Sequence, residues 1–187
     1  MTQDKYQSIL TFWFNESSVK NHWSKNDEYD QKIKEKFLKD LERAIQNKYD
    51  DWQDYSKSSL ALIILLDQFS RNVFRNDSRS YAQDTKSRLL VTEGVDREYL
   101  DELDLPERLF YLMPLVHSEE MQDHLFVKQL GEVFLRDHPN YLEIKKSWES
   151  HSTVIKKFGR YPHRNEILQR QSTLEEIAFL KEPNSSW

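Results

Sequence analysis

The stretch Leu60-Ala61-Leu62-Ile63-Ile64-Leu65-Leu66-Asp67-Gln68-Phe69 decides the fold, because it begins with the longest apolar run in the chain. Residues 60–66 are apolar on every side, which predicts a buried central helix that continues to about Arg71. A buried strand stays open as an alternative, since periodicity does not separate the two over so short a run. Seven apolar residues fall well short of the ~20 that a membrane-spanning helix needs.

The segments around this run carry apolar residues at helical spacing. Residues 4–14 place Tyr6, Ile9 and Trp13 on one face, and residues 27–47 repeat apolar side chains every four positions. Charged residues fill the opposite face, as expected for helices at the surface. Further helices are predicted over residues 78–93, 106–113, 118–136, 140–158 and 172–180. The sequence therefore predicts an all-α protein of seven to eight helices, with residues 1–187 as a single domain.

Four positions are typical of helix ends. Gly94 and Gly159 follow helical patterns and suit the left-handed residue after a helix. Pro114 is expected to break the helix before it, since proline lacks a backbone N–H. Ser172-x-x-Glu175 has the pattern of a capping box that opens the last helix.

Composition excludes several classes of protein. Only three residues are glycine, where average usage gives roughly 13, so phosphate-binding glycine loops and hairpin-rich β folds are not expected. The net charge of −5 argues against general binding of nucleic acid or anionic membranes. There is no cysteine, and the first residues lack the pattern of a secretory signal. We expect a soluble, cytoplasmic protein without a cofactor.

The first polar segment follows the apolar run. Asp67, Arg71 and Asn72 stand at the end of the predicted central helix. Spacing of four residues makes Asp67 and Arg71 a simple ion pair in one interpretation. In the other, a partly buried carboxylate and guanidinium line a cleft, where Arg71 and Asn72 bind a ligand.

The second polar segment surrounds His117. Glu119 and Glu120 follow it, and Ser118 has the position of a helix cap. A histidine beside carboxylates is suited to acid–base chemistry near neutral pH. His117, Glu120 and His124 also share one helical face at i, i+3, i+7, but no recognised metal signature is present, so a metal site is not predicted.

The third polar segment, Phe158-Gly159-Arg160-Tyr161-Pro162-His163-Arg164-Asn165, is basic. Residues 156–170 carry five positive charges against Glu166 alone. Arginine matches carboxylate or phosphate oxygens two at a time, so Arg160, Arg164 and Asn165 are candidates for binding an anion. A solvated basic loop is the alternative explanation of the same composition.

These stretches, in this order, resemble the bacterial family known as domain of unknown function 924. The resemblance extends from Ile9 to Leu180 and rests on Phe12-Trp13-Phe14, Trp23, Asp30, Phe37, Trp52, Leu60–Phe69, Arg71-Asn72, Asp84, Tyr111-x-Met113-Pro114-Leu115, His117-Ser118-Glu119, Phe158–Asn165, Ser172-Thr173-x-Glu175-Glu176 and Phe179-Leu180. Ser70, Asn15 and Gln169 depart from the family pattern of proline, glycine and glycine, which affects loop geometry. The resemblance implies antiparallel helical hairpins in a bundle like that of tetratricopeptide repeats, and no activity.

Two functions follow from these residues. In the first, His117 or His163 moves a proton, Asp67 or Glu119 orients the imidazole, and the arginines bind a small anionic molecule. In the second, the helical surface binds a protein partner and the polar residues only hold the helices together. The first function requires that the three polar segments, which all lie at predicted helix ends, meet in the folded bundle.

Overall fold

The apolar run lies at the centre of the molecule as a helix, so the alternative of a strand is wrong. The computed structural model describes residues 2–183 and 185–186. In it α4 (Ser56–Ile63) continues as a π-helical turn (Ile64–Phe69) and then as α5 (Ser70–Val73), which together form a central rod. Every side chain from 60 to 66 is fully buried, as a helix that is apolar on all sides requires.

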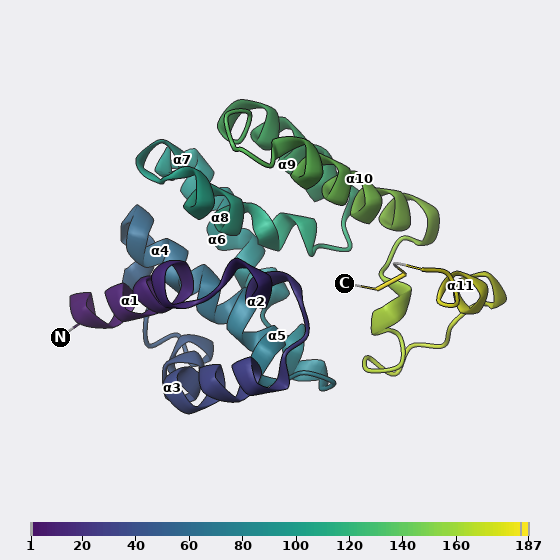
Figure 1. Cartoon of the computed structure of the whole chain (residues 1–187), viewed down its shortest axis with the longest axis horizontal. Coiled ribbons are helices and arrows are strands. Elements are labelled where there is room, and N and C mark those ends of the chain that lie inside the picture. Colours follow the sequence, from purple (N-terminus) through teal and green to yellow (C-terminus); the bar gives the residue numbers. More distant parts are fainter. Residues whose placement is uncertain (1, 184, 187) are drawn as a thin grey trace.

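The other helices lie around this rod or outside that layer, with α11 off to one side (Figure 1). They are α1 (Thr2–Thr11), α2 (Val19–Trp23), α3 (Asp27–Ile45), α6 (Asp84–Asp96), α7 (Tyr99–Glu102), α8 (Leu105–Val116), α9 (Met121–Phe134), α10 (Tyr141–Phe158) and α11 (Leu174–Phe179). Short 3-10 or π-helical turns occupy Phe12–Glu16, Asp50–Asp54, Ser78–Ser80 and Pro162–Arg164. Within the described residues there is no strand, so the predicted all-α class is confirmed, although the helices are shorter and more numerous than expected.

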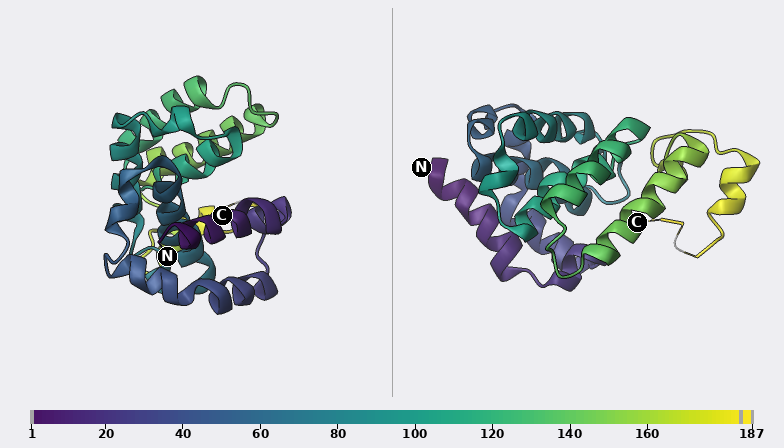
Figure 2. Two further views of the ribbon diagram at one scale, coloured as in Figure 1. Left: turned by 90° about the vertical axis from the view of Figure 1, so that its left-hand side faces the viewer. Right: turned by 90° about the horizontal axis from the view of Figure 1, so that it is seen from above.

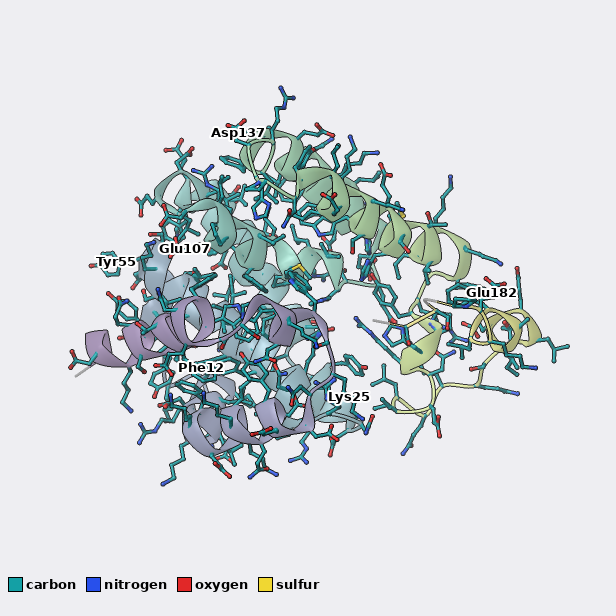
Figure 3. The ribbon with its side chains drawn as sticks, in the orientation of Figure 1. Phe12, Lys25, Tyr55, Glu107, Asp137 and Glu182 are labelled. Atoms are coloured by element: carbon teal, nitrogen blue, oxygen red, sulfur yellow. The ribbon has the colours of Figure 1, made fainter. Side chains whose placement is uncertain are left out.

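Most of the helices pack either on the central rod or on a helix that does. The helices α1, α3, α6 and α8 all pack against the central rod, α9 packs on α8, and α10 packs on α9. Figure 2 shows α9 and α10 side by side, and the short connection between them makes them antiparallel. One continuous core joins α1 through α10, with Phe12 and Trp13 in edge-to-face contact with Phe69 of the rod. Figure 3 shows Phe12 among the elements of this core.

A second, small apolar cluster joins the chain after α10 to that helix. Val154 and Ile155 of α10 contact the buried ring of Tyr161, with Phe158 and Phe179 at the edge. Gly159 ends α10 with φ of 67°, so the predicted left-handed cap is confirmed. From this glycine the chain turns away from the helical body (Figure 1).

Pro114 does not break its helix, contrary to the prediction. α8 continues to Val116, so proline removes one backbone hydrogen bond close to the helix end. Leu115 and Val116 beyond it are fully buried, and that burial holds the last turn in place. The capping box of the last helix is also shifted by one residue, because Thr173 and Glu176 make the reciprocal hydrogen bonds.

Gly94 does not end a helix either, because it lies inside α6 and is buried. A Cβ atom built at this position would lie 1.8 Å from Oη of Tyr111 and 2.7 Å from its Cζ. Glycine is needed here for the close approach of α6 and α8, whose side chains meet at this point.

Replacing Gly94 with alanine tests that contact. Overpacking of this kind costs about 1–3 kcal/mol, so urea unfolding of Gly94→Ala should show a free energy of unfolding lowered by about that amount. Tyr111→Phe removes the nearest atom, so the double variant should be destabilised by less than the sum of the two single variants. Glu93→Ala, at an exposed neighbour, should change stability by no more than about 0.5 kcal/mol. Strict additivity of the two substitutions would contradict the contact.

Candidate functional site

Asp67 is a fully buried carboxylate at the end of the central rod. Its neighbour Gln68 donates to Oδ2 at 2.6 Å, and Nη1 of Arg71 lies 3.0 Å from Oδ1, as the spacing of four residues predicted. Nδ1 of His117 lies 2.9 Å from both oxygens. Burial by itself would raise the pKa of Asp67, but the charge of Arg71 and the contact with His117 lower it to about 2. The group is therefore an ionised carboxylate at neutral pH.

His117 is the residue that caps the C-terminal end of α8. Burial, opposed by the charge of Asp67, lowers the pKa of its imidazole, so the ring is neutral at pH 7. An ionised carboxylate only accepts hydrogen bonds, so the ring hydrogen lies on Nδ1 and points at Asp67. The other nitrogen, Nε2, then carries the lone pair. Since 16% of the side chain is exposed, this imidazole reaches the surface.

A row of alternating charges continues from Asp67 toward the C-terminal part of the chain. Nη2 of Arg71 contacts Oδ1 of Asp84 at 3.0 Å, and Nη1 of Arg164 donates to the other oxygen of Asp84 at 3.1 Å. Nη2 of Arg164 also donates to the backbone carbonyl of His117 at 2.8 Å. The buried Arg164 guanidinium lies between the rings of Tyr81 and Tyr161, at 4.6 and 4.5 Å from their centroids. The first and third polar segments therefore meet at His117.

Glu119 joins the second polar segment to the third, but it does not orient His117. Its Oε1 accepts from the backbone N–H of Tyr161 at 2.8 Å, and its two oxygens accept from Nη1 and Nη2 of Arg170 at 2.6 and 2.9 Å. Burial would raise the pKa of Glu119, whereas Arg170 and the Tyr161 N–H lower it. Of the two carboxylates proposed to orient the imidazole, the structure places Asp67 against it.

Arg160 and Asn165 hold the third segment together. Arg160 forms a two-point ion pair with Glu176 at 2.6 and 2.8 Å. The amide of Asn165 donates to Ser172 at 3.0 Å and accepts from Arg170 at the same distance. These contacts lie within residues 160–176. Arg160 and Asn165 therefore support the segment that carries Arg164, and Arg164 is the residue that contacts His117.

Asn72 lies at a different place from the other candidates. Its amide donates to Asp30 at 2.7 Å, and Arg75 binds the same carboxylate through two nitrogens. These residues line a hollow of about 320 Å³ between the start of α3 and the end of α5. Lys25, which is labelled in Figure 3, also lines this hollow.

Three further histidines lie around Tyr161. The ring centroids of His163, His151 and His124 lie 5.5, 6.0 and 6.4 Å from that of Tyr161. Burial, reinforced by the charge of Arg164, lowers the pKa of His163 to about 3, and burial lowers that of His151 to about 4. Both are neutral at pH 7. His163 thus lies beside the ring that supports Arg164.

The residues His117, Glu120 and His124 do not converge. Nε2 of His124 bonds to the backbone carbonyl of Ser118 at 2.8 Å, and Glu120 is exposed at the start of α9. Among residues 2–183 and 185–186, no group of three acidic or histidine side chains is arranged to hold a metal ion.

Sequence reasoning missed Asp84, Tyr81 and Arg170 as parts of this site. Asp84 begins α6, where an acidic residue is common for helix capping alone. The one signal for it was its place among the residues that carry the family resemblance. Arg170 was counted in the basic stretch, but nothing local pointed to Glu119 as its partner.

Together these contacts define an all-helical protein with a polar site built from the ends of the central rod, α8 and α10. The chain belongs to the family described as bacterial protein of unknown function (DUF924), whose sequence model matches residues 9–184. This confirms the family resemblance and adds no activity. Within the described residues, no helix has the length and apolar character to cross a membrane.

A solved structure of similar fold is described as the protein of unknown function ATU0120 from Agrobacterium tumefaciens. It is 29% identical in sequence, with a TM-score of 0.88 over 97% of this chain and 99% of that chain. No curated protein matches the sequence.

The buried histidines predict how stability depends on pH. Below its ordinary pKa of 6.5, His151 in the unfolded chain takes up a proton, whereas the folded state takes none until about pH 4. Stability is therefore lost as pH falls from 6.5 to 4, by up to about 1.4 kcal/mol per pH unit for one histidine. Urea unfolding over this range should show a shallower pH dependence for His151→Gln than for the wild type. An equal slope in the two proteins would contradict a neutral, buried His151.

Proposed function

We propose that the protein binds a small anionic molecule at the exposed edge of His117 and moves a proton through that imidazole. The observation that carries the proposal is the contact between Asp67 and His117. A fully buried, ionised carboxylate holds Nδ1 of a neutral histidine that reaches the surface. This arrangement leaves Nε2 as a proton acceptor with a fixed direction.

The chemistry of such a pair is that of a general base. A proton taken from the ligand, or from a water beside it, goes to Nε2 and makes the ring cationic. The ionised Asp67 stabilises that cation and does not itself take up the proton. Because the step is the same in hydrolysis and in isomerisation, it supports acid–base chemistry in general.

Arg71 is the residue expected to hold the negative group. One fifth of its side chain is exposed, and it lies against the same carboxylate as His117. Guanidinium has five N–H donors, so Nη1 can bind Asp67 and Nη2 can bind Asp84 while other donors remain for a ligand. Asp67 and Asp84 together balance Arg71 and Arg164, so the site has no excess positive charge. This balance favours a ligand with a single negative charge, such as a small carboxylate, over a polyphosphate.

A protein-interaction module is the second candidate. Large apolar side chains are exposed on neighbouring helices, with 55% of Leu125 and 71% of Val133 on α9 and 75% of Leu142 on α10 accessible to solvent. In this case the paired charges around His117 serve only to hold the helices and the C-terminal residues together.

A thermal-shift screen separates these functions. The wild type is tested against small monocarboxylates, dicarboxylates and phosphate esters, each up to millimolar concentration. A ligand at 100 times its Kd adds about 2.7 kcal/mol, which corresponds to a rise in Tm of about 5–10 °C. We expect a monoanionic compound to raise Tm in the wild type and not in His117→Gln or Arg71→Met.

His138→Gln is the matched control, because His138 lies in the loop between α9 and α10. It should respond to the ligand as the wild type does. If no compound raises Tm in any of the proteins, or if a compound raises Tm in the His117 and Arg71 variants as much as in the wild type, the proposal is overturned and the interaction module is favoured.

A further inference from the structure

Residues 160–182, here called the C-terminal strap, follow the sharp turn at Gly159. This glycine has a φ of 67°, and a Cβ atom placed on it would meet nothing within 4 Å. Figures 1 and 2 show that the strap leaves α10 and lies to one side of the helical body, with α11 at its outer part. The junction is therefore a left-handed turn in open space.

The strap carries its own stabilising contacts. Arg160 binds Glu176 through two hydrogen bonds, and Thr173 and Glu176 cap α11 reciprocally. Asn165 links Ser172 and Arg170. All of these bonds lie within the strap, so they persist whether or not it touches the body.

Two ion pairs attach the strap to the body. The body contributes Asp84 and Glu119, and the strap contributes Arg164 and Arg170, in contacts of 2.6 to 3.1 Å. The side chains of Glu119 and Arg170 are 26% and 23% exposed, so solvent and salt reach this pair. Opposite charge thus selects where the strap docks.

Apolar contact adds Tyr161 as a deep anchor and a contact between Phe179 of α11 and Phe158 of α10, whose ring centroids lie 5.2 Å apart. The Tyr161 ring is buried against α10, and its hydroxyl donates to the carbonyl of Val116 at 2.6 Å. By contrast, α11 leaves 87% of Leu174 and 42% of Ile177 exposed. The outer strap therefore buries little of its own apolar surface, and less burial means a smaller free energy of local opening.

We propose that the C-terminal strap docks and undocks as a unit, and that docking completes the site at His117. When docked, Arg164 neutralises Asp84 and holds the carbonyl of His117. When undocked, the body retains Asp67, Asp84 and Glu119 against Arg71, which gives the exposed face a net negative charge. The consequence for ligand binding rests on the proposed function, whereas the movement itself does not.

Hydrogen exchange of the full-length protein, read by mass spectrometry, tests the movement. Glu119→Gln removes the charge that binds Arg170, and hydrogen bonds to charged groups contribute about 1.5–3 kcal/mol. We therefore expect exchange in residues 160–182 to rise by about tenfold or more, with residues 56–73 of the central rod unchanged. Raising the salt concentration from 50 to 500 mM should accelerate the same peptides in the wild type.

Glu175→Gln is the matched control, because it removes an exposed ion pair of 3.1 Å between the strap and Lys157 of α10. Exposed pairs contribute little, so its exchange should match that of the wild type. Equal exchange in Glu119→Gln and the wild type, or a rise spread over the whole chain, would overturn the proposal.

Binding of the monocarboxylates used in the thermal-shift screen gives a separate result. Strap opening in Glu119→Gln with weaker binding supports both proposals. Strap opening in a protein whose wild type binds none of the compounds supports the movement and overturns the ligand site. Strap opening with binding equal to the wild type overturns the inference that docking completes the site.

Discussion

The ionised carboxylate of Asp67, which has no contact with solvent, is the constraint on which the rest of the site depends. Taking such a group out of water costs several kcal/mol unless partners and hydrogen bonds compensate. Gln68, Arg71 and His117 supply that compensation from two different elements. The need to satisfy one buried charge therefore fixes the end of α8 against the central rod and gives the imidazole a single orientation.

The same requirement extends outward through the row of charges. Arg71 needs a second acceptor and finds Asp84, and Asp84 in turn receives Arg164 from the C-terminal strap. Arg71 and Asp84 are each about one fifth exposed, whereas Arg164 at the end of the row is again buried. Structural support and chemistry are not exclusive here, because the groups that hold the helices together also set the protonation of His117. Its imidazole is the part of the network that combines a fixed tautomer with access to the surface.

The sequence predicted features that depend on local spacing and missed those that depend on distant contacts. The apolar side chains of residues 60–66 favour burial on all sides of a helix. The spacing of four residues places Asp67 and Arg71 on one face of that helix. Gly94 has the same local signature as a capping glycine, and only the approach of Tyr111 from another helix explains it. Arg160 resembled an anion ligand because the sequence does not show that Glu176 folds back to it.

The protonation of His117 is the central claim, and 15N NMR of the imidazole measures it directly. At pH 7.5 we expect a neutral ring with the hydrogen on Nδ1, bonded to Asp67, and an unprotonated Nε2. In Asp67→Asn that preference for one tautomer should weaken, because the amide no longer carries the negative charge that favours Nδ1–H. A hydrogen on Nε2, or a cationic ring at pH 7.5 in the wild type, would contradict the account.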